Sequence, residues 1–114
     1  MSCIFCKIVE GSIPSSKVYE NEQVLAFRDI QPAAPVHILI IPKKHIATMN
    51  DVEADDRGLI GDLHMAAQEI AKQEGVYDSG YRLINNCGAD SGQVVLHIHY
   101  HLLAGEKLGA LNAK

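Results

Sequence analysis

The chain has 114 residues, a formal net charge of −4 at pH 7 and a hydrophobic fraction of 47%. This length fits a single domain over residues 1–114, and the composition is that of a folded protein rather than a disordered one. The acidic balance argues against a protein that binds duplex nucleic acid through many phosphate contacts. The sequence also lacks an apolar run of about 18 residues that could cross a membrane.

The three cysteines do not suggest a disulfide framework. Their number is odd, and the first ten residues lack the basic start and long apolar stretch of a secretory signal. We therefore expect a cytoplasmic protein in which Cys3 and Cys6 are reduced and bind a metal or take part in redox chemistry. Cys87 stands apart from them and is expected to be a small packing residue.

The first third of the chain predicts one short helix and three strands. Residues 1–10 have an amphipathic pattern, and the composition of residues 11–15 is typical of a loop. Residues 17–19 fit a short strand. Residues 23–30 alternate between apolar and mixed positions, which predicts a half-buried strand. Residues 36–41 are a continuous run rich in β-branched side chains, which predicts a central strand that ends at the following proline.

One main helix is expected in the middle of the chain. Asn50 or Asp51 can cap its start, and Gly75 fits its C-terminal end. Beyond it, residues 81–85 and 94–103 predict a strand and a long strand on either side of a glycine-rich turn. Strands interrupted by one main helix indicate an α+β domain with a mostly antiparallel sheet. The apolar positions at helical spacing are Leu59, Ile60, Leu63, Ala66, Ala67 and Ile70.

His97, His99 and His101 alternate within the last predicted strand. Side chains alternate between the faces of a strand, so the three imidazoles should share one face, about 6.6 Å apart along the strand. The apolar residues between and beside them, Leu96 included, should point to the core. Three interpretations compete: structural histidines with satisfied partners, a metal cluster, and a neutral imidazole that attacks phosphorus and leaves a phosphohistidine for water to cleave.

The surroundings of these histidines resemble those of the histidine-triad (HIT) nucleotide hydrolases and transferases, above all the Hint branch of purine nucleoside phosphoramidases. The resemblance covers almost the whole chain. It implies the HIT fold, with a five-stranded antiparallel sheet, one main helix and a short N-terminal helix. It also implies a homodimer with a ten-stranded sheet and hydrolysis of AMP joined to an amine. The matching stretches are Ile4-Phe5-Cys6-Lys7-Ile8, Ile13-Pro14, Leu25-Ala26-Phe27-Arg28-Asp29-Ile30, Ala34-Pro35-Val36-His37, Ile41-Pro42-Lys43-Lys44-His45, Asn86 and Gly92-Gln93.

The resemblance also implies catalytic roles. His99 would be the nucleophile on the α-phosphorus and would form a nucleotidyl-histidine without a catalytic cofactor. His101 would hydrogen-bond the phosphate oxygens and help the leaving group, and His97 and His37 would orient and support both. The ring nitrogen of His99 that does not attack should donate to a fixed carbonyl, because such a bond holds the tautomer.

The resemblance places a purine nucleotide (AMP, GMP or a phosphoramidate) beside these histidines. Asp29 would accept hydrogen bonds from the ribose hydroxyls. Val94 stands where animal Hint proteins have a hydroxyl residue on the leaving-group side, and its side chain cannot donate. The walls of the base pocket would be Phe5, Ile8, Ile13, Phe27 and Ile30, and donors to the phosphate would come from Asn86, Gly92 and Gln93.

Cys3 and Cys6 have the spacing of a zinc knuckle. His45 and His97 would complete a Cys2His2 set that resembles the site of bacterial relatives and of the related uridylyltransferases. Such a zinc would be structural, and a reduced, metal-free pair is the alternative. Three rival functions also stay open: a dinucleoside polyphosphate hydrolase like the Fhit branch, a purine-nucleotide-binding regulatory protein with incidental turnover, and a zinc hydrolase that uses the three alternating histidines as ligands.

Overall fold

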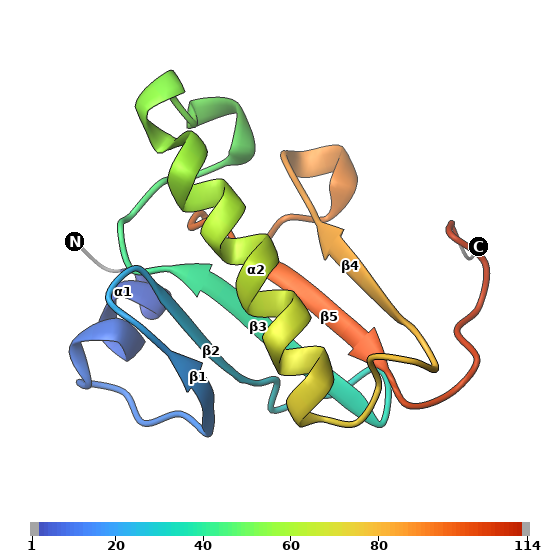
Figure 1. Ribbon diagram of the computed structural model, residues 1–114. Helices are drawn as coiled ribbons and strands as arrows, with labels where there is room; N and C mark the ends of the chain where they lie inside the picture. Colours follow the sequence, from blue (N-terminus) through green and yellow to red (C-terminus); the bar gives the residue numbers. More distant parts are fainter. Residues whose placement is uncertain (1–2, 113–114) are drawn as a thin grey trace.

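A five-stranded antiparallel sheet with the strand order β1-β2-β3-β5-β4 forms the middle of the molecule (Figure 1). This computed structural model describes residues 3–112. The predicted architecture of a five-stranded antiparallel sheet, one main helix and one short helix is confirmed. The elements are α1 Ile4–Glu10, β1 Lys17–Glu20, β2 Val24–Arg28, β3 Val36–Pro42, α2 Arg57–Gln73, β4 Tyr81–Asn85 and β5 Tyr100–Ala104, with 3-10 turns at Met49–Asp51, Ala54–Asp56 and Ala89–Ser91.

The short helix α1 lies near the predicted position. Cys3 is its N-cap and accepts a hydrogen bond from the Cys6 N–H at 3.4 Å, and Gly11 ends it at φ +88°. A left-handed residue at the end of a helix favours glycine, which has no Cβ to clash. Residues 1 and 2, which the sequence assigns to the same helix, lie outside the described residues.

The strand β2 is buried on both of its faces, so the prediction of a half-buried strand is wrong. Val24 and Ala26 are 0% exposed and pack in the core under α2, while Leu25 and Phe27, 0% and 5% exposed, pack in a second core with α1. The alternation of side chains is as predicted. The second face is buried because α1 and the segment after it cover a surface that the sequence pattern leaves open to solvent.

The helix α2 covers one face of the sheet with the predicted apolar stripe, in which Leu63, Ala66, Ala67 and Ile70 are buried. Its predicted start is wrong. Thr48 caps a separate 3-10 turn and accepts from the Asn50 N–H at 3.2 Å. Extended backbone at Val52 (φ −68°, ψ 132°) then interrupts the helical path before a second turn, and α2 begins at Arg57. Gly75 follows the helix at φ +74°, as predicted.

The long strand predicted over residues 94–103 is present only in its second half. β5 pairs with β3 and β4 from Tyr100 onward, opposite Ile40 and Asn85. The ladder stops near Pro42, which has no N–H to donate and whose carbonyl accepts from His97 Nε2 at 2.8 Å. Leu96, predicted to point into the core, lies in the unpaired half and is 60% exposed.

None of the helices in residues 3–112 is long and apolar enough to cross a membrane.

Candidate active site

Four imidazoles gather on the α1 side of the sheet. His37 projects from β3 and His101 from the neighbouring β5, and their ring centroids lie 5.1 Å apart. The ring of His99 is 5.2 Å from that of His101. The Phe5 ring packs edge-on against both His99 and His97, at 5.1 and 5.8 Å. The three alternating histidines therefore share a face as predicted, although two of them precede the strand.

The tautomer of His99 is set by a backbone carbonyl. Its Nδ1 lies 2.8 Å from the carbonyl oxygen of His97, which can only accept, so Nδ1 carries the proton. In the neutral ring Nε2 then has the free lone pair. The fixed carbonyl predicted from the sequence is thus that of His97. The His99 side chain is 7% exposed, which leaves little of the ring in contact with water.

A second chain of hydrogen bonds sets the tautomers of His37 and His101. The Ala33 N–H donates to His37 Nδ1 at 2.9 Å, so the proton of neutral His37 is on Nε2. That Nε2 lies 2.9 Å from His101 Nδ1 and donates to it. His101 must then carry its own proton on Nε2. The arrangement provides one lone pair, on His99, and one adjacent N–H donor, on His101.

Burial favours the neutral forms of His37 and His101 by lowering the pKa of each ring. It lowers the pKa of His101 to about 4, with further lowering from the nearby His99 and His37, and Asp29 partly opposes the shift. Burial also lowers the pKa of His37, again against the charge of Asp29. The Asp29 carboxylate lies 3.4 Å from His37 Nε2 and accepts from the Gln31 N–H at 2.8 Å. Near pH 7 the pair therefore acts through hydrogen bonds rather than through positive charge.

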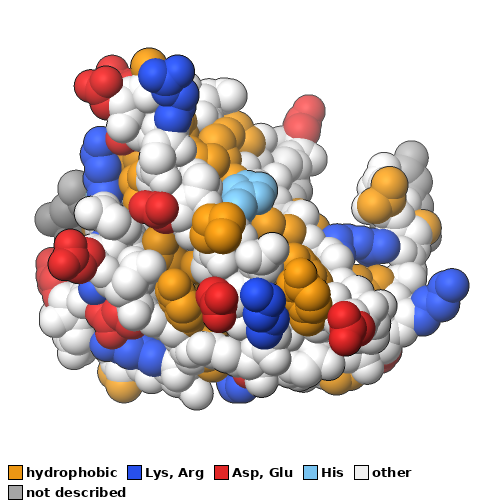
Figure 2. Space-filling view, in the orientation of Figure 1, with side chains coloured by type: hydrophobic (Ala, Val, Ile, Leu, Met, Phe, Trp, Pro, Cys, Tyr) orange, Lys and Arg blue, Asp and Glu red, His pale blue; other side chains and the backbone are white. Residues whose placement is uncertain are grey.

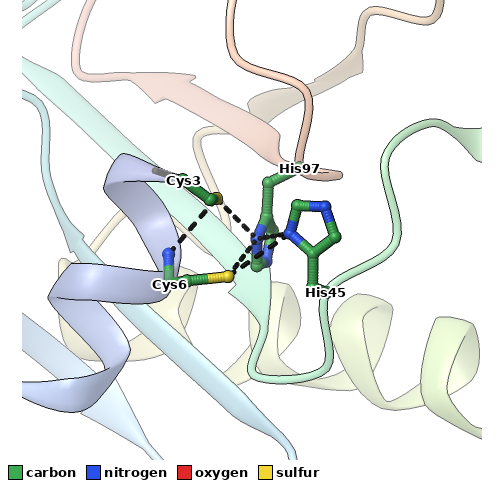
Figure 3. A group of neighbouring side chains, drawn as sticks. All are labelled: Cys3, Cys6, His45 and His97. Atoms are coloured by element: carbon green, nitrogen blue, oxygen red, sulfur yellow. Dashed lines mark hydrogen bonds between the residues drawn. The ribbon is translucent and has the colours of Figure 1, made fainter. Parts of the chain in front are cut away.

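The four residues predicted to bind zinc lie together (Figure 3). Cys3 is the N-cap of α1 and Cys6 lies in α1, while His45 and His97 come from the segments that follow β3 and precede β5. His97 Nδ1 is 3.4 Å from Cys3 Sγ, 3.6 Å from Cys6 Sγ and 3.2 Å from His45 Nδ1. Ligand atoms around a tetrahedral zinc, with bonds of about 2.3 Å to sulfur and about 2.05 Å to nitrogen, lie about 3.3–3.8 Å apart. The cluster therefore fits a zinc ion.

The hydrogen bonds around the cluster also suit a metal. His97 Nε2 donates to the Pro42 carbonyl at 2.8 Å, which directs the unprotonated Nδ1 toward the sulfur atoms. Burial and the neighbouring Cys3 raise the pKa of the Cys6 thiol to about 11. A metal must therefore displace a proton that the metal-free protein holds at neutral pH.

A second group of ligand-type atoms, from Asp29, His37 and His101, lies close enough to bind a metal. The hydrogen bond from Ala33 argues against this use, because it holds His37 Nδ1 as an acceptor and so keeps the proton on Nε2, the atom that faces the group. Among residues 3–112, the three alternating histidines do not converge on one point, since His97 belongs to the cysteine cluster. The geometry thus disfavours the zinc hydrolase with three histidine ligands.

A pocket of about 190 Å³ opens between α1, β2 and the segment after α1. All five apolar residues predicted for the base pocket line it, and so does Asp29. Ile30 stands at its rim and is 95% exposed. Ser15 also lines it, and its hydroxyl is buried without a hydrogen-bond partner in residues 3–112. The pocket is apolar along its walls, with a carboxylate at one edge, which suits a planar base attached to a ribose.

Comparison with known proteins agrees with this geometry. The model of the HIT domain family matches residues 10–108. The chain belongs to the HIT domain family. It is 51% identical over 110 residues to a protein of Escherichia coli (strain K12) named purine nucleoside phosphoramidase, a match that covers 96% of this chain and 92% of that protein. It is also 45% identical over 108 residues to a HIT-like protein of Chlamydia pneumoniae, covering 95% and 97% of the two chains.

Solved structures of HIT proteins share the fold closely. A HIT family hydrolase from Legionella pneumophila Philadelphia 1 superposes with a TM-score of 0.93 at 51% identity, over 95% of this chain and 96% of that one. A histidine triad protein from Clostridium difficile gives a TM-score of 0.95 at 50% identity, over 98% and 97% of the two chains.

The glycine-rich turn of this HIT protein is tied to the segment after β3. Gly88 and Gly92 adopt φ values of +87° and +93°, which glycine allows without strain. The Gln93 side chain accepts from the Gly88 N–H at 2.9 Å and donates to the carbonyls of Ala47 and Val95 at 2.9 and 3.0 Å. Its amide donors are therefore used inside the protein.

The other residues predicted around the phosphate lie on either side of this turn. Asn86 is half-buried directly after β4, and Val94 is 88% exposed. Two contributors to the HIT site escape sequence reasoning: Ala33, whose N–H fixes His37, and Asn85, whose side chain donates to the His99 carbonyl at 3.1 Å. Ala33 acts through its backbone, and Asn85 has no spacing that sets it apart, so neither carries a signal in the sequence.

Proposed function

We propose that this HIT protein hydrolyses purine nucleoside 5′-phosphoramidates, in which AMP is joined to an amine, or the related aminoacyl adenylates. The hydrogen bond from His99 Nδ1 to the His97 carbonyl carries the proposal, because it leaves Nε2 unprotonated beside the N–H of His101. The similarity to the E. coli protein named purine nucleoside phosphoramidase supports the same substrate class.

The reaction proceeds in two steps. His99 Nε2 attacks the α-phosphorus, a bond forms between that nitrogen and phosphorus, and the amine leaves with one proton taken from solvent. The ring becomes positively charged, and its Nδ1–H strengthens the hydrogen bond to the His97 carbonyl. Water then cleaves the nucleotidyl-histidine, which releases AMP and one proton and restores neutral His99. The N–H of His101 stabilises the phosphoryl oxygens in both steps.

The nucleotide is held by the pocket beside these histidines. The base packs against the apolar lining of the pocket, to which Phe5 and Phe27 both belong; these two rings contact each other edge-on at 5.8 Å. Asp29 accepts hydrogen bonds from the ribose hydroxyls at the edge of the pocket. The turn that begins at Gly88 and ends at Gly92 brings backbone N–H groups to the phosphate. Apolar walls discriminate weakly between bases, so adenine and guanine nucleotides are both accepted.

Trapping the intermediate tests this function. Intact protein mixed with an adenosine phosphoramidate and quenched rapidly should gain the mass of one adenylyl group, and peptide mapping should locate it on His99. The variant His99→Gln should bind AMP, but its turnover should fall by at least about 1,000-fold, because no other group replaces the nucleophile. His64→Gln, at an exposed histidine of α2, is the matched control. Turnover by His99→Gln at the wild-type rate would refute the mechanism.

The same assay separates the two other nucleotide functions. A kcat/KM higher for a diadenosine polyphosphate than for the phosphoramidate would favour the polyphosphate hydrolase. Tight binding of AMP by calorimetry, with cleavage of neither compound, would favour a nucleotide-binding regulatory protein.

We also propose that Cys3, Cys6, His45 and His97 bind one structural zinc ion per chain. The distances between their ligand atoms and the orientation of His97 support this assignment. Zinc would tie α1 to the segments that flank the sheet, and all four of its positions would be filled by protein. Metal analysis of purified protein should find one zinc per chain and a clear loss in Cys3→Ser, whereas Cys87→Ser should keep the metal. If protein purified under reducing conditions is found to contain no zinc, the assignment is refuted.

A homodimer with a ten-stranded sheet completes the proposal, in a reducing compartment such as the cytoplasm. β4 is an edge strand of the sheet, and an uncovered edge offers free backbone groups to a second chain. Apolar side chains also reach the surface, with Tyr81 of β4 37% exposed and Met65 of α2 60% exposed. Figure 2 shows the face of the molecule that α2 covers, with hydrophobic side chains along both sides of this helix. Light scattering should give twice the mass of one chain.

A further inference from the structure

The nucleophile lies in a segment that the sheet does not hold. β5 begins at Tyr100, and residues 93–99 have no ladder partner in β3 or β4. A reacting group has to be held in a defined geometry for fast chemistry. The position of His99 therefore depends on other contacts, and these can be followed from the peptide group between His97 and Ile98.

This peptide group is bound at both of its ends. Its N–H, from Ile98, donates to the Ile46 carbonyl at 2.8 Å, and its carbonyl, from His97, accepts from His99 Nδ1 at 2.8 Å. Each end is also adjacent to a residue of the cysteine–histidine cluster. His45 immediately precedes Ile46, and His97 supplies the carbonyl itself.

The helix α1 adds a contact from the other side. Cys3 and Cys6 of the cluster bracket Phe5, whose ring packs edge-on against His97 and His99 at 5.8 and 5.1 Å. A metal bound by the two cysteines therefore also fixes the ring that lies against the nucleophile. The His37–His101 pair differs, because Ala33 and the strand pairing of β3 with β5 hold it independently of the cluster.

We propose that the Cys3–Cys6–His45–His97 cluster, once it holds its metal, positions the nucleophile by fixing the His97 carbonyl and the Phe5 ring, which together keep the proton of His99 on Nδ1. The inference rests on the proposed function for its catalytic meaning, and on the zinc assignment. His97 and Phe5 act here as positioning residues, since neither bonds to the reacting phosphorus.

Nitrogen-15 spectra of the histidine rings test the proposal without turnover. In the zinc-loaded protein His99 should show one tautomer, with the proton on Nδ1. After zinc is removed by a chelator in the presence of a thiol reductant, His99 should populate both tautomers, while His37 and His101 keep theirs and serve as the internal control. The kcat for an adenosine phosphoramidate should fall by about 10-fold to 100-fold, the range typical for loss of an outer contact, with a smaller change in KM.

Two further samples keep the test decisive if chelation unfolds the chain. Replacement of zinc by the larger cadmium ion should shift the His99 ring nitrogens and leave those of His37 and His101 in place. Phe5→Leu, which keeps all four ligands, should bind zinc normally and show the second His99 tautomer. The proposal is overturned if His99 shows only the Nδ1–H tautomer in the folded, chelated protein, or in both the cadmium-loaded protein and Phe5→Leu. The cluster would then only anchor α1. Failure of the phosphoramidate assay with the tautomer results intact would overturn the proposed function and leave the positioning role standing.

Discussion

The two faces of the sheet use the same strands for different purposes. Ile38 and Ile40 of β3 and Leu102 of β5 project toward α2 and are 0% exposed in an aliphatic core. From the opposite face, His37 projects from β3 and His101 from β5. One alternating pattern thus gives one face an aliphatic core, and gives the other a smaller core with α1 together with the imidazoles of the candidate site. Burial lowers the pKa of both His37 and His101, which favours their neutral forms near pH 7.

The largest expected effect is that of replacing His101, which should lower kcat strongly and change the free energy of unfolding little. His101→Leu removes the N–H beside His99, and kcat should fall by about 100-fold to 10,000-fold, the usual contribution of a positioned acid or donor. The free energy of unfolding should change by less than about 1 kcal/mol, because His37 can donate to Asp29 instead. Steady-state kinetics and urea unfolding measure both. A large loss of stability with unchanged kcat would contradict this, because it would mean that His101 stabilises the fold and takes no part in the reaction.

The converse substitution tests the α2 face. Ile70 is 0% exposed, so Ile70→Ala should lower the free energy of unfolding by about 2–5 kcal/mol through lost burial and the cavity left behind. At a temperature where the variant is folded, kcat/KM should stay within about threefold of wild type, since Ile70 lies in the core on the side away from the imidazoles. Met65→Ala, at an exposed position of the same helix, is the control, and it should leave stability nearly unchanged in the isolated chain.

The smallest effect concerns pH. Burial lowers the pKa of His101 from 6.5 to about 4 and lowers that of His37 as well. Between pH values of about 4 and 6.5, His101 is protonated more in the unfolded chain than in the folded chain. The free energy of unfolding should therefore rise with pH over this range and level off above about pH 7. His101→Leu should flatten part of this slope in urea titrations at several pH values. Equal slopes in the two proteins would show that folding does not lower the pKa of His101.

The sequence predicts the sheet, the two helices and the shared face of the histidines, because these depend on local periodicity. It predicts the wrong length for the last strand, since alternation alone cannot reveal that Pro42, far away in the chain, ends the ladder. It also misses the backbone N–H of Ala33 and the side chain of Asn85. Both contacts join segments distant in sequence, and only the folded chain brings them together.

The early end of β5 has a mechanical consequence. In the proposed mechanism, His99 forms a bond to phosphorus and later breaks it, so its ring has to shift slightly in each cycle. Residues 93–99 form no strand pair with β3 or β4, so they can follow this movement while the strand pairing of the sheet stays intact. In that mechanism a short segment outside the ladder, held by hydrogen bonds such as the one from the Ile98 N–H to the Ile46 carbonyl, takes up the movement, and the paired strands that stabilise the fold stay in place.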